Sequence, residues 1–423
     1  MHLLKNENLI LNSDKMEEVY IVDAVRSPIG KFLGSISNIS ATHLGAQVIQ
    51  GLLARTIINA NEIDEVIVGN VISGGLGQNI AKQVVMYAGL PSSISAYSVN
   101  KVCASSLKAI GLGAEAIAAG NAQMIIAGGI ESMSNAPFAI HGVRTLQKFG
   151  NMTLDSFLDK LKQNNMRPDQ FEMVDEMLSE GLTDCYSNLH MGTIAEDMAI
   201  KYKITRKEQD AFAFESQKKA AIASSEGKFK REIIPIKLNN GNIFDTDECI
   251  RKDTSMEKLA ALKPAFKPDG TITAGNASQL SDGAGFVLLM GEKIMNKYKF
   301  KPLAKIKSYA SSGSNPNDYG MAPVPAIKKS LQKVGLNINN IDIIEINEAF
   351  CVQTLGVVKE LGIDLKKLNV NGGATAIGHP LGATGACILS NLLYAMIDRN
   401  VNLGLASLCH GGGGAASMII EKM

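Results

Sequence analysis

The chain has 423 residues and a formal net charge of +1, which excludes a polybasic surface for nucleic acid or an anionic membrane. A hydrophobic content of 46% is sufficient for two ordinary core domains plus an insertion. Six cysteines with no CxxC pair argue against a disulfide framework and a metal site, and they indicate a reducing compartment. Because no apolar run reaches the ~18 residues of a membrane span, we expect a soluble protein.

Residues 1–15 precede a second methionine, Met16, and the first strand, which is expected at residues 19–22. This stretch contains no arginine, carries Glu7 and Asp14, and has too short an apolar run for a secretory signal. It is predicted to be a disordered leader. The last three residues are not a peroxisomal address, so a cytoplasmic location is the default expectation.

The first half of the chain places a cysteine between a strand-like and a helical segment. A strand over residues 65–70 ends at Asn70, residues 99–100 lead into a small-residue helical run after Cys103, and residues 122–129 form a buried strand. Backbone N–H groups and the helix dipole stabilise a thiolate at a helix N-terminus, so we expect a lowered pKa for the Cys103 thiol. The alternative is a small, packed core cysteine.

Three glycines, Gly74, Gly75 and Gly77, resemble a dinucleotide-binding loop only superficially. They lack the strand-GxGxxG-helix spacing in which a helix N-terminus meets a pyrophosphate. We therefore exclude NAD as a cofactor.

Residues 135–274 are mostly charged helices and loops without a strong strand pattern. Within them, residues 158–178 are predicted to form a solvated helical excursion. An additional oligomer contact is the alternative for that segment.

The second half repeats the layout of the first. A strand over residues 341–347 ends at Asn347, residues 370–371 lead into a glycine-rich turn that holds His379, and a strand over residues 403–408 precedes Cys409. Four glycines follow at residues 411–414, and they allow positive φ and close approach of backbone N–H groups to an anion. Short apolar strands alternating with Ala-rich helices predict an α/β fold with mixed, largely parallel sheets and a ligand site beyond the strand ends.

Taken together and in this order, these blocks resemble the thiolases, and within them the biosynthetic acetoacetyl-CoA class. The resemblance runs from about residue 17 to the C-terminus. The matching blocks lie at residues 22–30, 69–72, 77–79, 99–108, 127–134, 190–192, 273–278, 347–350, 370–385 and 409–414.

The resemblance implies a five-layer αβαβα sandwich built from two homologous halves, with the active site where they meet. The implied boundaries are a first half at residues 16–134, completed by about residues 275–300, and a second half at residues 301–423. The insertion at residues 135–274 would hold coenzyme A (CoA).

The implied activity is that of an acetyl-CoA C-acetyltransferase, a reversible condensation of two acetyl-CoA to acetoacetyl-CoA and CoA through an acetyl-cysteine. By resemblance, Cys103 carries the acetyl group, His379 accepts its thiol proton, and Cys409 deprotonates the methyl group of the second acetyl-CoA. Asn347, through a water, and His379 would hold the enolate oxygen, and the N–H groups of Cys103 and Gly411 would hold the tetrahedral oxyanion.

The resemblance also implies how the substrate is held. His190 would approach the CoA thioester, and Met191 would shorten the acyl pocket. CoA would be bound as a substrate, not as a permanent cofactor, with Arg251 on a phosphate. The other CoA-binding residues are expected to be Leu182, Ala274, Ser278 and Leu280. A homo-oligomer, dimer or tetramer, is expected, and a mitochondrial location is the alternative to the cytoplasm.

Three residues depart from the family pattern. Ser106 stands where thiolases usually have glycine, and its side chain could crowd the helix that follows the nucleophile. His410 replaces an apolar or amide residue after Cys409, and Gln279 replaces the usual glycine near the pantetheine. None of them removes a catalytic group.

Three other functions compete with this one. A degradative 3-ketoacyl-CoA thiolase would differ only in its broader chain length. A decarboxylating condensing enzyme of the ketoacyl-synthase type lacks the second cysteine, so Cys409 argues against it. A catalytically silent lipid- or partner-binding protein is disfavoured because Cys103, His379, Cys409 and Asn347 are all retained.

Overall fold

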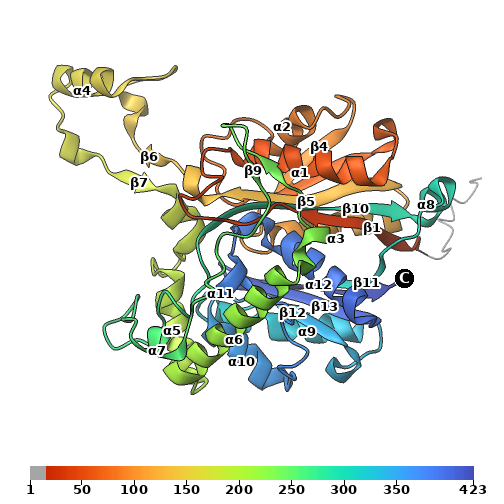
Figure 1. Ribbon diagram of the computed structural model, residues 1–423. Coiled ribbons are helices and arrows are strands. Elements are labelled where there is room, and N and C mark those ends of the chain that lie inside the picture. Colours follow the sequence, from red (N-terminus) through yellow and green to blue (C-terminus); the bar gives the residue numbers. More distant parts are fainter. Residues whose placement is uncertain (1–15) are drawn as a thin grey trace, which may run out of the picture.

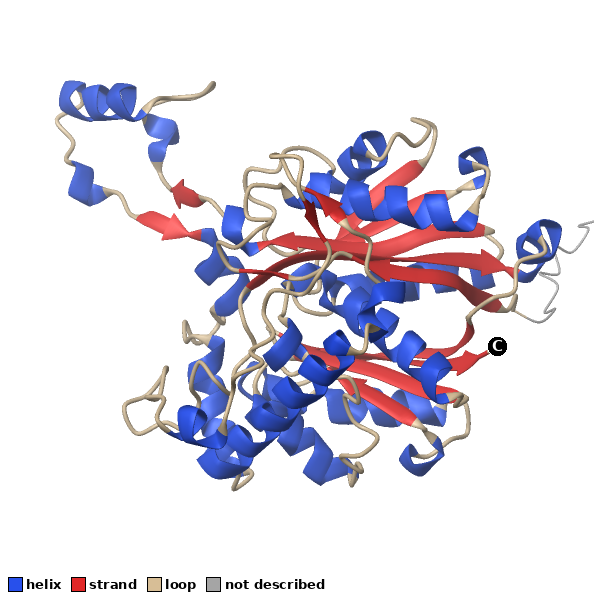
Figure 2. Ribbon diagram, viewed as in Figure 1, coloured by secondary structure: helices blue, strands red, loops and turns tan. Residues whose placement is uncertain are grey.

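The computed structural model describes residues 16–423, so the predicted leader at residues 1–15 lies outside the described part of the chain. Two sheets and three helical layers alternate in the order αβαβα (Figure 1, Figure 2). The upper sheet has the order β4 (Ser95–Val99), β3 (Glu65–Gly69), β5 (Met124–Ser132), β10 (Ser281–Gly291) and β1 (Val19–Arg26). The lower sheet has the order β11 (Ala304–Gly313), β14 (Gly414–Lys422), β13 (Leu403–His410) and β12 (Ile343–Ile346).

The two sheets have the same internal pattern, which confirms the repeat predicted from the sequence. In the upper sheet β3 is parallel to β4 and β5, whereas β10 is antiparallel to β5 and β1. In the lower sheet β12 is parallel to β13, and β14 is antiparallel to β13 and β11. A single parallel bridge from Ile344 to Leu368 stands where β4 stands in the upper sheet. Among the described strands, a short antiparallel pairing between β1 and β11 alone joins the sheets.

The middle layer consists of α3 (Ser105–Ala118) and α12 (Thr384–Arg399), which pack on each other and on both sheets. Glycines let α3 approach the lower sheet closely, since a Cβ on Gly111 would lie 2.9 Å from the Tyr309 ring. The outer helices are α1 (Ala41–Thr56) and α2 (Ile80–Tyr87) above, and α9 (Pro323–Gln332) and α10 (Cys351–Leu361) below.

Residues Leu381–Arg399 are long and apolar enough to meet the length and composition criteria for a membrane span, and 83% of that window is buried inside the protein. The expectation that no apolar run reaches this length is therefore wrong. Most of the helix is buried because sheets cover it from above and below, as is typical of a helix in the core of a large protein.

The insertion between β5 and β10 has more regular structure than its sequence predicts. It contains the short pairs β6 (Phe138–Ile140) with β7 (Met173–Asp175) and β8 (Ile236–Lys237) with β9 (Ile243–Phe244). Its main helices, α5 (Met191–Lys201), α6 (Arg206–Ser225) and α7 (Met256–Ala260), lie along the lower half. The remaining short elements are β2 (Gly30–Lys31), α8 (Glu292–Tyr298) and α11 (Ala374–Ile377).

The β6 and β7 strands carry an excursion that projects away from the body (Figure 1). The helix there, α4 (Leu154–Gln163), begins earlier and ends earlier than the predicted helical stretch at residues 158–178. It ends where Asn165 adopts a left-handed φ of 52°, and Pro168 follows shortly after, which disfavours continuation of the helix.

Candidate active site

Cys103 lies in the tight turn between β4 and α3, two residues before the helix begins. Val102 has a φ of 46°, a conformation that is strained for a β-branched residue. Ser105 holds this turn, because its Oγ accepts from the Lys101 N–H at 2.8 Å and donates to the Val102 carbonyl at 2.6 Å. The turn places the thiol in the interior, with Cys103 8% exposed.

The backbone around His379 is fixed by residues at the start of β10 and just before it. Gly378 has a φ of 110°, and a Cβ at that position would lie 2.4 Å from the Ser281 Oγ, so only glycine fits there. The His379 N–H donates to the Gln279 carbonyl at 3.1 Å and lies 3.2 Å from the Ser281 Oγ. These bonds hold the imidazole beside the nucleophile turn of the other half.

The hydrogen bonds of His379 determine which ring nitrogen is protonated. The Thr384 hydroxyl donates to the Pro380 carbonyl at 3.0 Å, so its oxygen accepts from His379 Nδ1 at 2.7 Å. Nε2 is therefore the bare nitrogen, and it lies 3.3 Å from the Cys103 Sγ. The thiol is placed to donate its proton to Nε2.

Burial keeps this pair neutral in the resting protein. Desolvation raises the pKa of Cys103 to about 12, and hydrogen bonds from the N–H groups of Cys103 and Gly411 oppose this rise in part. Desolvation also lowers the pKa of His379 to about 4. The predicted lowering of the Cys103 pKa is thus wrong for the resting state, because the second half covers the helix N-terminus and removes water from it.

Cys409 and Asn347 complete the site from the lower sheet. Cys409 is 1% exposed at the end of β13, and its pKa is raised by desolvation and then by the charge of Cys103, so the two thiols are near neighbours. Asn347 Nδ2 lies 3.4 Å from His379 Nε2. The Asn347 Oδ1 is buried, and no described residue hydrogen-bonds to it. Buried polar atoms without a hydrogen-bond partner are rare, so this amide oxygen is placed to accept a hydrogen bond from a bound group.

Of the residues predicted to hold CoA, Leu280 pairs with His379 in a parallel bridge and Met191 lies beside Gly411. Leu182 and Leu280 pack in the same apolar cluster as Cys103, whereas Met191 shares a cluster with Cys409. Further out, the Arg251 guanidinium donates to the Ala274 carbonyl at 3.2 Å. The Ser278 N–H donates to the Ala349 carbonyl at 3.0 Å, so it is already hydrogen-bonded within the protein.

His190 caps α5, because its Nδ1 accepts from the Gly192 N–H at 3.0 Å. Its ring stacks on Phe266 with the centroids 4.8 Å apart, and Phe266 meets Phe350 edge-on. Burial lowers the pKa of His190, which favours the neutral imidazole. Met191 lies beside Gly411, since a Cβ on that glycine would be 3.9 Å from the Met191 Sδ.

Sequence reasoning missed several residues that position the site. Thr384, which sets the His379 tautomer, was detectable as a hydroxyl in the same glycine-rich turn. Phe266 carries no local signal, because its contact with His190 spans the insertion. Glu131 is fully buried and accepts from the N–H groups of Val71, Ile72 and Gly382 at 2.8–3.2 Å, so it ties the end of β3 to the turn after His379.

Two of the departures from the family pattern fit without crowding. The Ser106 Oγ accepts from the Ala386 N–H at 3.0 Å, and glycines at positions 129 and 385 leave room for it. The predicted crowding of α3 by Ser106 is therefore wrong. His410 Nδ1 donates to the Gly411 carbonyl at 2.7 Å and so braces the turn that presents the Gly411 N–H.

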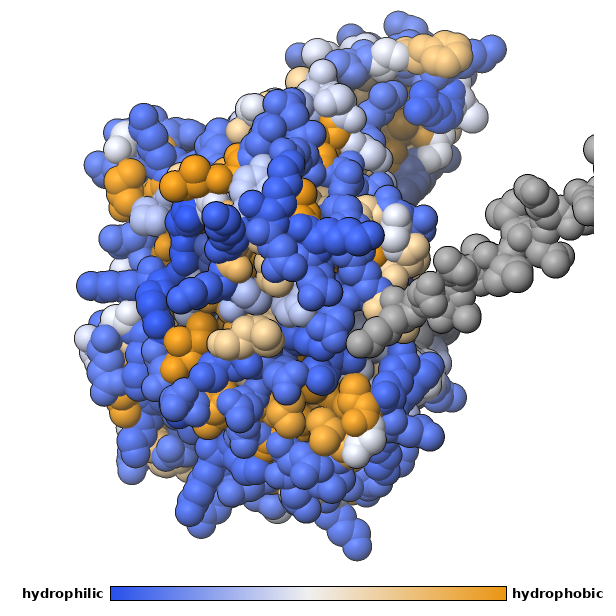
Figure 3. Space-filling model, turned by 90° about the vertical axis from the view of Figure 1, so that its right-hand side faces the viewer, coloured by the Kyte–Doolittle hydropathy of each residue, from blue (hydrophilic) through white to orange (hydrophobic). Residues whose placement is uncertain are grey.

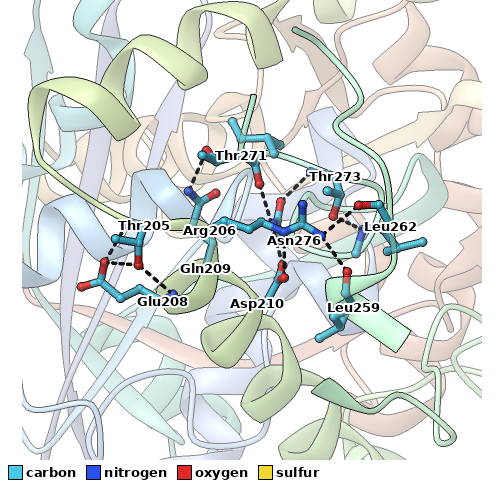
Figure 4. A network of polar contacts seen from close by, with 12 residues as sticks. Thr205, Arg206, Glu208, Gln209, Asp210, Leu259, Leu262, Thr271, Thr273 and Asn276 are labelled. Carbon is cyan, nitrogen blue, oxygen red and sulfur yellow. Dashed lines mark hydrogen bonds and ion pairs between the residues drawn. The ribbon is translucent and has the colours of Figure 1, made fainter. Parts of the chain in front are cut away.

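A polar network at the start of α6 holds the loop that leads to the residues predicted to bind CoA (Figure 4). Asp210 accepts from Arg206 at 2.7 Å and from Asn276 at 2.9 Å. Arg206 also donates to the carbonyls of Leu259 and Leu262. The loop at residues 259–276 is thereby fixed just before Ser278.

The comparisons with known proteins agree with this architecture. The model of the thiolase N-terminal domain matches residues 19–293, and that of the thiolase C-terminal domain matches residues 300–422. The chain belongs to the thiolase family.

Within the thiolase family, the chain is similar to several named proteins. An acetyl-CoA acetyltransferase of Allochromatium vinosum is 46% identical over 411 residues, which cover 96% of this chain and 100% of that protein. The Escherichia coli acetyl-CoA acetyltransferase is 45% identical with the same coverage. The crystal structure of the Bacillus anthracis acetyl-CoA acetyltransferase matches with a TM-score of 0.90 and 37% identity over 97% of this chain and 100% of that one. Human mitochondrial 3-ketoacyl-CoA thiolase in complex with CoA matches with a TM-score of 0.88 and 36% identity over 96% and 98%.

Proposed function

We propose that this chain is an acetyl-CoA C-acetyltransferase that condenses two acetyl-CoA to acetoacetyl-CoA and CoA, and also catalyses the reverse thiolysis. The contact that carries the proposal is the 3.3 Å approach of the Cys103 Sγ to the bare His379 Nε2, with a second buried thiol, Cys409, beside it. The name shared by relatives 45–46% identical over nearly the whole chain supports the same activity.

In the first half-reaction, Cys103 passes its proton to His379 Nε2 as its sulfur attacks the acetyl-CoA carbonyl. A neutral thiol and a neutral imidazole can react in this way without separating charge before the substrate arrives. The N–H groups of Cys103 and Gly411 stabilise the oxyanion. The CoA thiolate leaves with the proton of the Cys409 thiol, so an acetyl-cysteine, a Cys409 thiolate and a protonated His379 Nε2–H remain. Without Cys409, the proton on His379 can serve the leaving CoA instead.

In the second half-reaction, Cys409 removes a proton from the methyl group of the second acetyl-CoA. The enolate oxygen is held by His379 Nε2–H and by Asn347 through a water, so charge develops where hydrogen-bond donors already point. The enolate carbon attacks the acetyl group on Cys103, the carbon–carbon bond forms, and the Cys103 sulfur is released. This sulfur takes back the proton from His379 Nε2, and Cys409 keeps the proton from the methyl group, so all three groups are neutral again.

Met191 supports a short acyl substrate. Its sulfur lies beside Gly411, so it limits the space next to the reacting carbonyl. The competing function, a degradative thiolase of broad chain length, would need open space at this place for the longer acyl chain. We expect acetoacetyl-CoA to be cleaved far better than 3-ketooctanoyl-CoA. Each added methylene would clash with the Met191 side chain instead of gaining ~0.8 kcal/mol from burial in an apolar pocket.

The test is a steady-state thiolysis assay with the two substrates at equal enzyme concentration. Met191→Ala should improve the C8 substrate relative to acetoacetyl-CoA. Equal or better activity of the unaltered protein on the C8 substrate would assign it to the degradative function.

We also propose that the chain is a homo-oligomer, a dimer or tetramer, that works with acetyl-CoA, acetoacetyl-CoA and CoA in the cytoplasm. Within residues 16–423, β4 has a strand neighbour on one side only, and its Tyr97 is 37% exposed, which suits pairing with another copy. On the face shown in Figure 3, apolar side chains form separate patches among hydrophilic ones. Light scattering after size-exclusion chromatography measures the oligomer.

A further inference from the structure

The side chain of Gln279 connects segments that meet at the site. Its Nε2 donates to the Cys249 carbonyl at 2.8 Å and lies 3.4 Å from the Thr375 carbonyl. Its Oε1 accepts from the Arg251 guanidinium at 3.2 Å. Its backbone carbonyl accepts from the His379 N–H at 3.1 Å. One residue thus contacts both the imidazole segment and an exposed cation.

The charge of Arg251 remains available to an anion. Its guanidinium is held by two neutral acceptors, Gln279 and the Ala274 carbonyl, and no described carboxylate lies within ion-pair distance of it. The neighbouring Lys258 is different, because its ammonium is paired with Asp253 at 2.6 Å. Arginine presents five donors in a planar fork, so two can be fixed by the protein while the others face a phosphate.

We propose that Gln279 is a positioning residue for CoA: its amide holds Arg251 ready for a CoA phosphate while its backbone fixes His379 at the reacting end. The inference rests on the proposed function and deepens it. A free arginine side chain loses rotamer freedom on binding, and restraint in the unbound protein reduces that loss. The glycine usual in the family at this position has no side chain with which to do so.

The test compares CoA with pantetheine, which lacks the nucleotide and its phosphates. Isothermal titration calorimetry should give a dissociation constant for CoA up to about tenfold weaker in Gln279→Ala, the size of the rotamer freedom that one long side chain loses on binding, and an unchanged one for pantetheine. The KM for acetyl-CoA should rise in proportion. The kcat should stay within about twofold, because the carbonyl that accepts from His379 remains.

A double-mutant cycle tests whether Gln279 acts through Arg251. In an Arg251→Ala background, Gln279→Ala should cause no further loss of CoA affinity. Gln47→Ala is the matched control, since Gln47 also bridges two segments, through both the carbonyl and the N–H of Lys237, but lies on the outer helix α1. If Gln279→Ala does not fold, Gln279→Met, which keeps the volume and removes the bonds, replaces it.

An unchanged CoA affinity, an equal loss for CoA and pantetheine, or additive losses with Arg251→Ala would each overturn the proposal. So would failure of the unaltered protein to bind CoA. Binding of CoA without condensation or thiolysis would instead overturn the proposed function, and the calorimetric comparison would still decide the role of Gln279.

Discussion

At the scale of single residues, the site combines a neutral nucleophile with a neutral base. The Thr384 hydroxyl forces the proton of His379 onto Nδ1, and burial opposes charge on both Cys103 and His379. Proton transfer between them is therefore coupled to the arrival of the thioester, which develops its own negative charge near the N–H groups of Cys103 and Gly411.

The lowered pKa of His379 predicts an unusual pH dependence. Below a pKa of about 4 the imidazole is protonated and cannot accept the thiol proton, so kcat/KM for acetyl transfer should fall through about pH 4. Because this folded-state pKa lies below the unfolded value of about 6.5, the contribution of neutral His379 to stability is complete above that value and is lost as the pH falls towards 4. Stopped-flow pH jumps measure the rate, and an acid limb near pH 6.5 would contradict the prediction.

The two cysteines should separate the half-reactions. Cys409→Ala should still become acetylated, since transfer to Cys103 needs only His379, but it should lose condensation for lack of a base. Mass spectrometry after incubation with acetyl-CoA should show one acetyl group on the peptide containing Cys103. Cys103→Ala is the control and should carry none.

Retention of more than about a tenth of the condensation rate in Cys409→Ala, a loss below ~1.4 kcal/mol, would remove Cys409 from the role of base. An acetyl group on Cys409 in the unaltered protein would reverse the two assignments.

At the scale of the elements, the helix that follows the nucleophile also caps the central helix. The first residue of α12 follows Ala383, which provides no side-chain cap, and the Ser106 Oγ on α3 accepts from the Ala386 N–H instead. A helix N-terminus has four N–H groups without partners in its own helix, and one of them is satisfied here from another helix.

Ser106→Ala should therefore lower the free energy of unfolding by about 1–2 kcal/mol, because a buried N–H loses its acceptor. Denaturant-induced unfolding measures it. Ser225→Ala is the control, since the exposed Ser225 hydroxyl bonds within its own turn, where water can replace it. An equal effect of the two substitutions would show that Ser106 does not act as a cap.

The sequence predicts the parts of this site that are local and leaves out those that depend on packing. The strands that end at Asn70 and Asn347, the turn before α3 and the glycine turn after Cys409 follow from short-range patterns. The protonation of Cys103 does not, because the second half of the chain removes its water. The contact of Phe266 with His190 is equally invisible, since aromatic residues so far apart in sequence carry no pairing signal.

At the scale of the whole molecule, the excursion is separate from the site. It has its own small core, in which Phe157 meets Phe171 edge-on, and within residues 16–423 it joins the body through β6 and β7 alone. Ile140 pairs with Met173, so an Asn-Gly turn can replace residues 141–172 and close the hairpin.

This shortened protein should keep its acetylation rate within about twofold, because none of the predicted site residues lies in the excursion. A single-turnover acetylation assay measures the rate, and light scattering shows whether the assembly changes. Loss of acetylation in a folded variant would show that the excursion supports the active site.

The central position of α12 has a consequence for synthesis on the ribosome. This helix covers β1 and β10 of the first half as well as β12 and β13 of the second, yet it is made only after residue 383. Before α12 is made, part of the inner surface of the upper sheet is exposed to solvent. Exposed apolar strands are prone to aggregate. The nascent chain should therefore expose this apolar surface between the synthesis of β10 and that of α12, and a truncation before residue 384 should be insoluble even though it retains the whole first half.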